Sequence, residues 1–427
     1  MVSQIRSDEP EYKAWLALDW ADQKHVWALQ PSGRQERERG EVEHTPEAVE
    51  AWMQGLLQRF GGGPIAVCLE QARGALVYML MKYQGLVLYP AHPATVGLFR
   101  AALYPSGAKD DPQDADLLLD LLLQHRSHLR AWKPDTVETR TLQLLVQQRR
   151  QWVDQRTAHS NQLTQVLKQY FPQVLGWFGE VSSPLVQAFL ERWPTLEAAQ
   201  TARPQTLRDF FHAHNCRGEP VIERRIAALG KAVPATRDQA ILRSSQLQVE
   251  GLLPLLAVLR QNLAQLDREI ATAARQHPDF AVFDSFPGAG PVLAPRLLAA
   301  FGTQRERFAA AGDLQSFSGI APVTERSGKL LWVHFRYACP KFLRQTFQEW
   351  AGHSIAFCGW ARAYYQQQTE KGADHHAAVR SLAAKWIRIA FRCWQTGTPY
   401  HEQTYLDSLR RHGSPLATRL GLTTAKP

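Results

Sequence analysis

Two short apolar runs near the N-terminus each end in an acidic residue. Residues 15–18 lead into Asp19, and residues 65–69 lead into Glu70. Runs of this kind are typical of buried strands, and a carboxylate at the end of a buried strand is costly to desolvate unless it is paired, hydrogen-bonded or bound to metal. If the two strands are neighbours, both carboxylates lie at one edge of a sheet. This feature favours an α/β fold with an acidic site at its strand ends.

The first 125 residues alternate strand and helix signals, and Thr45-Pro46 is a typical helix start. Three strands, helix, strand, helix, strand, helix is the order of an RNase-H-like fold, which we predict over residues 1–130. The expected elements are strands over 12–19 and 25–29, a polar strand ending near 43, a helix over 46–60, a strand over 65–69, a helix near 74–83, a strand over 86–89, a loop, and a helix from 111.

Asp111 and Asp114 lie three residues apart at the start of that last, leucine-rich helix. Asp111 before Pro112 fits a helix cap, and Asp114 fits the positive end of the helix dipole, so both have a structural explanation without metal. Together with Asp19 and Glu70, however, they make four carboxylates. Such oxygen ligands suit Mg²⁺, or another divalent metal, that also holds a phosphate. We therefore predict a metal site formed by these four acids.

The net charge of +9 is unevenly distributed along the 427 residues. Residues 1–125 hold 11 lysines and arginines against 17 acids, a net −6, whereas residues 126–427 hold 38 against 23, a net +15. A basic excess of this size suits a polyphosphate partner, because each neutralised phosphate releases counterions. Simple solubility is the alternative explanation.

Several classes of protein are disfavoured by composition. No apolar stretch reaches the roughly 18 residues that span a bilayer, and the acidic N-terminus does not resemble a signal peptide. We therefore expect a cytoplasmic protein without a membrane partner. The five cysteines are scattered and contain no CxxC pair, which argues against a disulfide framework or a structural zinc site.

The middle of the chain, residues 131–280, is predicted to be helical, with a small helical insert around residues 184–215. Two apolar seams with alternating spacings of three and four mark long helices, one over 142–170 and one over 252–273. A seam of this regularity packs against another helix. A coiled coil between subunits is the preferred interpretation, and an internal helical hairpin is the alternative.

The C-terminal part divides into a mostly helical region, 281–400, and a polar tail, 401–427. In the turn 286–291, Gly288 and Gly290 could let backbone N–H groups approach a phosphate, although an ordinary helix connection explains them equally well. The helix over 385–394 alternates basic and tryptophan residues, which fits nucleic-acid contact or, more simply, a core helix with a charged face.

Ser327 lies beside a glycine, which is commonplace in turns. Its surroundings are cationic, and arginine and lysine stabilise the charge on a phosphate under attack. The predicted nucleic-acid contacts near it are Arg326, Lys329, Arg336, Lys341 and Arg344.

These motifs together resemble the insertion-sequence transposases that have an N-terminal RuvC-like domain and a C-terminal serine domain, now called bridge-RNA-guided recombinases. The order and separation of the motifs carry the resemblance. They are Leu18-Asp19, Leu69-Glu70 with Gly74, Lys109-Asp110-Asp111-Pro112-Gln113-Asp114-Ala115, Phe286-Pro287-Gly288-Ala289-Gly290, Phe317-Ser318-Gly319-Ile320-Ala321-Pro322, and Arg326-Ser327-Gly328. The stretch from 137 to 278 is longer than in compact members, and Gln71-Ala72-Arg73-Gly74 replaces the usual Thr-Gly after the glutamate.

The resemblance implies that Asp19, Glu70, Asp111 and Asp114 take the four acidic positions of a RuvC-like DEDD domain and that Ser327 is the nucleophile. It further implies a covalent phosphoserine intermediate assisted by Mg²⁺, a structured guide RNA that pairs with donor and target DNA, and a tetramer that shares active sites between subunits. Two alternatives remain open from the residues. One is a metal-dependent junction-resolving nuclease in which Ser327 is structural, and the other is a non-catalytic nucleic-acid-binding protein.

Overall fold

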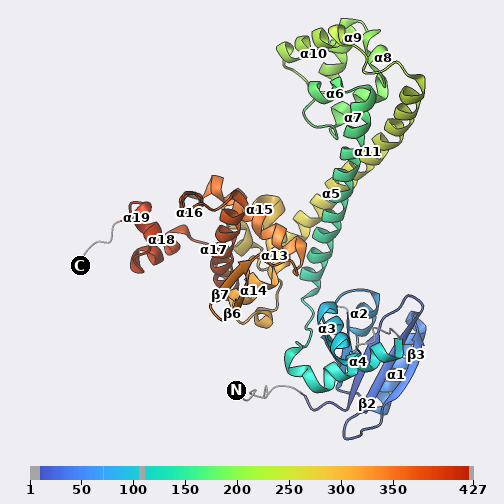
Figure 1. Ribbon diagram of the computed structural model, residues 1–427, viewed down its shortest axis with the longest axis vertical. Helices are drawn as coiled ribbons and strands as arrows, with labels where there is room; N and C mark the ends of the chain where they lie inside the picture. The colour runs from blue at the N-terminus through green and yellow to red at the C-terminus, as the bar shows by residue number, and fades with distance from the viewer. Residues whose placement is uncertain (1–9, 71, 105–110, 423–427) are drawn as a thin grey trace. The chain divides into compact units, whose positions relative to one another are not determined.

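The computed structural model describes residues 10–70, 72–104 and 111–422. The chain divides into two compact units, Met1–Pro134 and Asp135–Pro427, which are described separately below. Unit 1 mixes a sheet with helices, and unit 2 is mostly helical (Figure 1).

Unit 1 is built on a five-stranded sheet of order β3-β2-β1-β4-β5. β1 pairs antiparallel with β2 and parallel with β4, while β4 pairs parallel with β5. The strands agree with the sequence expectations and are β1 (Ala14–Asp19), β2 (Lys24–Pro31), β3 (Glu38–Glu43), β4 (Ile65–Leu69) and β5 (Leu86–Pro90).

Helices cover both faces of this sheet because successive strand side chains point to opposite faces. Leu16 and Leu18 of β1 join one buried cluster, and Ala17 joins another. The first cluster includes residues of α1 (Pro46–Arg59) and α2 (Ala75–Leu80), and the second includes residues of α3 (Pro93–Leu103) and α4 (Asp111–His125). The loop expected between the last strand and α4 is wrong in part, since it contains α3, which begins at Pro93 behind the capping side chain of His92.

Unit 2 begins with two long helices that lie side by side, α5 (Val137–Tyr170) and α11 (Gln239–Gln276) (Figure 1). Their apolar seams face each other within one chain, and Arg149 pairs with Asp267 across them. The preferred expectation of a coiled coil between subunits is therefore wrong for these seams. The periodicity correctly indicated which face of each helix is buried, but that face packs against the other helix of the same chain.

A small helical head joins the ends of α5 and α11. It has its own core, in which Phe189 and Phe211 pack with Leu167 of α5 and Leu253 of α11. The head is wider than the insert expected around 184–215, which corresponds to its helices α7 to α9. It consists of α6 (Gln173–Trp177), α7 (Pro184–Arg192), α8 (Leu196–Gln200), α9 (Pro204–Ala213) and α10 (Glu219–Lys231).

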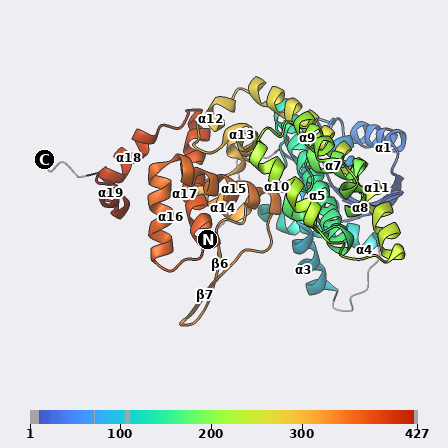
Figure 2. The same ribbon diagram turned by 90° about the horizontal axis from the view of Figure 1, so that it is seen from above.

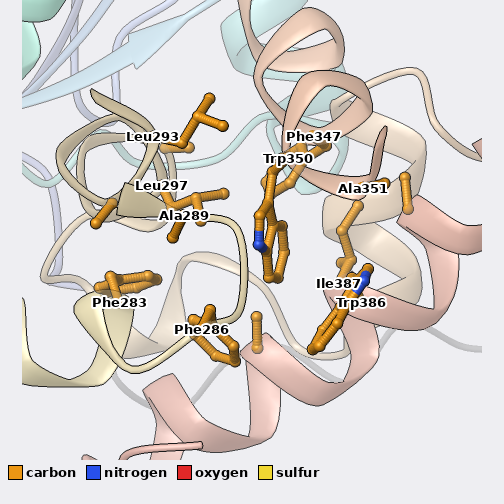
Figure 3. Close-up of a cluster of buried hydrophobic side chains, with 14 of the residues drawn as sticks. Phe283, Phe286, Ala289, Leu293, Leu297, Phe347, Trp350, Ala351, Trp386 and Ile387 are labelled. Carbon is orange, nitrogen blue, oxygen red and sulfur yellow. The ribbon is translucent and has the colours of Figure 1, made fainter. Parts of the chain in front are cut away.

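The remaining helices of unit 2 enclose an aromatic core, part of which Figure 3 shows. Trp386 and Trp394 are completely buried, so their helix is a core helix. The expected polar tail contains two helices with buried Leu409 and Leu416. The helices are α12 (Phe280–Asp284), α13 (Gly290–Phe301), α14 (Ala311–Phe317), α15 (Lys341–Phe357), α16 (Gly359–Glu370), α17 (His375–Thr396), α18 (Glu402–Arg411) and α19 (Pro415–Arg419).

A two-stranded hairpin, β6 (Val323–Ser327) and β7 (Leu330–His334), extends away from these helices (Figure 2). The sequence predicts a mostly helical region over 281–400, and the two strands differ from that expectation. Most of their side chains are exposed, and the pattern of alternating burial that identifies a strand is therefore missing.

Candidate active site

Asp19 and Glu70 lie at the same edge of the unit 1 sheet. β1 and β4 are parallel neighbours in which Leu18 pairs with Leu69, so Asp19, the last residue of β1, and Glu70, which directly follows β4, lie at the same end of the two strands. Asp19 points to the face of Ala17, which belongs to the cluster beneath α4, and Cys68 of β4 belongs to the same cluster. The structure thus brings these two predicted site residues to one edge of the sheet.

The acidic character of this edge is visible in its neighbour Cys68. Burial of the thiol, together with the nearby Glu70 carboxylate, raises the pKa of Cys68 to about 12. The thiol therefore stays protonated near neutral pH.

Asp114 lies in the first turn of α4, which packs across β1, β2 and β4. The residue is 4% exposed, and its Oδ1 forms an ion pair with Nη2 of Arg100 in α3 at 2.7 Å. The arginine supplies the positive charge that a buried carboxylate requires. Asp111 is the first residue of α4, and its side chain lies outside the described part of the chain.

The donor set suits a hard divalent cation, because all four predicted ligands are carboxylates. Within the described residues, no three histidine, cysteine or acidic side chains lie close enough together to hold a metal ion. Asp19 and Glu70 provide the shared edge, and Asp114 already has a cationic partner. The residues therefore suit a divalent metal in their chemistry, while the metal site itself stays a prediction, because the described side chains do not form a cluster of three ligands.

Two further acids of α4 attach the helix to the sheet. Asp116 and Asp120 form ion pairs with Arg37, and Asp116 also pairs with Arg39 of β3 at 2.8 Å. These pairs were not predicted, although the spacing of four residues places both acids on one face of α4. Arg100 was also missed, because an isolated arginine in an expected loop gave no signal.

Ser327 ends β6 and is exposed beside the two-residue turn Gly328-Lys329. Gly328 has φ of 58°, a left-handed conformation that glycine adopts readily. Ser327 pairs directly with Leu330, while Arg326 pairs with Leu331 on the opposite face of the hairpin. Ser327 and Arg326 therefore point to different sides, and Lys329 lies at the tip.

The other predicted basic residues lie at the base of the hairpin. Arg336 donates from Nε to the carbonyl of Ala321 at 3.2 Å, and Arg344 donates from Nη1 to the carbonyl of Arg336 at 3.0 Å. These two arginines therefore hold the hairpin in place as well as contributing charge. Lys341 is exposed at the first residue of α15.

The glycine turn before α13 is partly explained by packing. A Cβ on Gly288 would lie 2.8 Å from the backbone nitrogen of Ser354, so glycine allows α15 to approach closely. Trp350 Nε1 also donates to the carbonyl of Pro287 at 3.2 Å on the same side. Gly290, with φ of 55°, has open space where a Cβ would be. Nucleic-acid contact at this turn stays a prediction, with Gly290 as its more accessible residue.

Comparison with known proteins gives matches at both ends of the chain. A family model for DEDD transposases of IS110 elements, described as "Transposase", matches residues 16–172, and a second, described as "Transposase IS116/IS110/IS902 family", matches residues 281–366. The first match includes Asp19, Glu70, Asp111 and Asp114, and the second includes Ser327.

Similar proteins include insertion-sequence proteins of Streptomyces and Mycobacterium. The mini-circle putative transposase for IS117 of Streptomyces coelicolor is 28% identical over 80% of this chain and 83% of its own length. The insertion element IS110 uncharacterized 43.6 kDa protein of the same organism is 25% identical over 93% and 97%. The insertion element IS900 uncharacterized 42 kDa protein of Mycobacterium paratuberculosis is 25% identical over 80% and 86%.

The acidic strand edge and the two family matches define a transposase, an enzyme that moves an insertion sequence. The chain belongs to the IS110/IS116/IS902 family of transposases. Among its described helices, none combines the length and the apolar composition needed to cross a membrane.

Proposed function

We propose that this transposase joins donor and target DNA by attack of the Ser327 hydroxyl on a phosphodiester, with Asp19, Glu70, Asp111 and Asp114 as metal-binding acids. The observation that supports it most strongly is the position of Asp19 and Glu70 at the ends of two adjacent parallel strands. Carboxylates at the ends of buried strands are costly to desolvate, and a divalent metal at a phosphoryl-transfer site supplies the positive charge that stabilises them.

An RNase-H-like, RuvC-like assignment of unit 1 belongs to the same proposal. The order β3-β2-β1-β4-β5, with β1 antiparallel to β2 and parallel to β4, supports it. The succession of elements expected from the sequence and the DEDD family match support it further.

The proposed reaction conserves the number of phosphodiester bonds. Ser327 loses its hydroxyl proton to solvent, the serine oxygen bonds to phosphorus, and the bond from phosphorus to one deoxyribose oxygen breaks. That oxygen leaves as a free DNA end, which later attacks the phosphoserine of another strand and releases Ser327. A divalent metal bound by the acids would polarise the phosphate and neutralise its developing charge.

His334 is not placed to take the proton directly. Its position pairs with Val323, four residues along β6 from Ser327, a separation of about 13 Å at roughly 3.3 Å per residue. The serine is therefore proposed to lose its proton to water.

We propose that the protein binds a structured bridge RNA and that it assembles into a tetramer. The net charge of +15 on residues 126–427 suits extensive phosphate contact. The outer face of α11 carries Leu247, Leu255 and Val258, which are 51%, 49% and 51% exposed and offer an apolar surface to a second copy. A single copurifying RNA species of discrete length would support guidance, and a random smear would count against it.

The proposal is tested by transposition of a marked element with the full-length protein. We expect Ser327→Ala, Asp19→Asn and Glu70→Gln each to reduce transposition by at least about a hundredfold, the scale of losing one catalytic group. Two matched controls remain active: Thr324→Ala, an exposed hydroxyl on the opposite face of the hairpin, and Glu41→Gln, an exposed acid paired with Lys24. Wild-type activity in Ser327→Ala would overturn the serine mechanism.

A junction-resolving nuclease is the second candidate. The observation that favours it is that Ser327 stands next to a glycine turn, where serine is common for structural reasons. Divalent-metal-dependent cutting that survives Ser327→Ala but is lost in Asp19→Asn would select the nuclease.

A further inference from the structure

We propose that Trp332, held by His334, is a stacking platform for an unpaired DNA base next to Ser327. The inference deepens the proposed function, because it names a distorted, locally unpaired DNA as the substrate. It rests on the hairpin β6–β7, whose two faces carry different side chains.

Ser327 and Trp332 lie on the same face of the hairpin. Residues opposite each other in an antiparallel pair share a face, and the pairs Ser327–Leu330 and Glu325–Trp332 alternate with Arg326–Leu331. Ser327 and Trp332 are diagonal neighbours, which stand about 7–8 Å apart in such a ladder. This is close to two base steps of about 3.4 Å.

Trp332 is exposed and its ring is held in place. The side chain is 61% exposed, and its ring centroid lies 4.3 Å from that of His334 with an interplanar angle of 31°. The His334 ring is fixed in turn, since Nε2 lies 2.9 Å from Oε1 of Glu325 and Nδ1 lies 3.1 Å from the carbonyl oxygen of Phe335. A ring that is already held in one orientation loses little conformational freedom when a base stacks on it.

Charge identifies the partner as nucleic acid. Between residues 323 and 344 the sequence has five lysines and arginines and a single acid, Glu325, which is paired with His334. Arg326 and Lys329 flank Ser327 at the exposed end of the hairpin. An exposed aromatic ring among basic side chains is typical of surfaces that bind single-stranded nucleic acid, where bases stack and phosphates are neutralised.

An unpaired base suits the ring better than paired DNA. In a duplex both faces of every internal base are already stacked, so Trp332 would find no free π-face. A locally unpaired or splayed nucleotide offers one, and its adjacent phosphate would then lie beside Ser327. The platform would thus position the scissile phosphate and favour DNA that has already been opened.

The test measures equilibrium binding with the full-length protein carrying Ser327→Ala and with divalent metal removed, so that no chemistry occurs. The probes are two labelled DNA duplexes of one sequence, one fully paired and one with a short unpaired bubble. We expect the parent to prefer the bubble, and Trp332→Ala to weaken bubble binding about fivefold to a hundredfold, the range for loss of one base stack. Duplex binding, which depends on phosphate contacts, should be unchanged.

Two variants serve as matched controls. Trp332→Phe keeps an aromatic ring and should retain most of the preference. Leu331→Ala removes a side chain of similar exposure, 65%, from the opposite face of the hairpin and should leave it intact.

Three results would overturn the proposal: an unchanged bubble preference in Trp332→Ala, equal weakening of bubble and duplex, or a shift in oligomeric state that points to a protein partner at this face. Because Ser327 is absent from every sample and no metal is present, these outcomes do not depend on the serine mechanism. Failure of that mechanism would instead appear in the transposition assay.

Discussion

The buried carboxylate of Asp135 anchors the first residues of unit 2 by hydrogen bonds. Asp135 is 7% exposed and directly follows Pro134, the last residue of unit 1. Its Oδ1 accepts from the backbone nitrogens of Thr303 and Gln304 at 2.8 and 3.2 Å, and its Oδ2 accepts from Arg307 at 2.5 Å. One buried carboxylate thus attaches the start of unit 2 to the loop after α13.

We predict that Asp135→Asn destabilises unit 2 by about 1–3 kcal/mol near neutral pH, the scale of hydrogen bonds to a charged group. Urea denaturation of wild type and variant provides the measurement. Asp154→Asn is the control, because Asp154 belongs to an exposed pair with Arg150 and such a pair contributes only about 0.3–0.5 kcal/mol.

The difference in free energy of unfolding between the wild type and Asp135→Asn should depend on pH. Burial alone would raise the pKa of Asp135, but Arg307 and the Thr303 N–H outweigh it and hold that pKa below its usual value. A lowered folded-state pKa stabilises the fold above the unfolded value of about 3.9, and that stabilisation is lost as the pH falls through the folded value. The difference between wild type and Asp135→Asn should therefore shrink in acid. A difference that grows in acid would contradict this assignment.

At the level of residues, local sequence patterns predict residues that end a buried strand, but they do not predict ion pairs between residues far apart in the chain. Asp19 and Glu70 could be predicted because each terminates an apolar run, a local signal. Arg100 could not, since its partner Asp114 lies on another helix and only the folded chain brings them together.

At the level of elements, the long helices α5 and α11 show what periodicity does and does not determine. The spacing correctly predicted that Leu256, Leu263 and Ile270 would be buried. It gave no information on whether the facing helix came from the same chain. The sequence did not predict the exposed hairpin β6–β7 or the helices α18 and α19. Their residues are polar or exposed, so these segments lack a strong apolar period.

The internal hairpin predicts different consequences for the two faces of α11. Leu263→Ala removes a side chain that is 4% exposed and should cost about 2–5 kcal/mol of stability without changing the oligomeric state. Leu255→Ala with Val258→Ala alters the outer face and should change stability by no more than about 0.5 kcal/mol per site while weakening self-association.

Thermal unfolding and sedimentation at several protein concentrations measure both effects. If Leu263→Ala kept its fold but the oligomer dissociated, the apolar seam of α11 would join subunits. Unchanged assembly in the double variant would remove the outer face of α11 from the proposed interface.

At the level of the whole molecule, the chain combines an acidic strand edge in unit 1 with an exposed serine on a basic hairpin in unit 2. The fold class and the order of the motifs were predictable, because insertion-sequence transposases of this family carry them in sequence.

The central claim is that Ser327 bonds to DNA while the acids of unit 1 support the reaction. The most direct measurement is denaturation of the full-length protein during reaction with its element DNA, digestion with trypsin and nuclease, and mass spectrometry of the peptides. Cleavage after Arg326 and Lys329 isolates Ser327-Gly328-Lys329. We expect a nucleotide attached to this peptide in the wild type, at least about a hundredfold less in Asp19→Asn, and none in Ser327→Ala. Recombined DNA without such an adduct, or an adduct at another residue, would contradict the account.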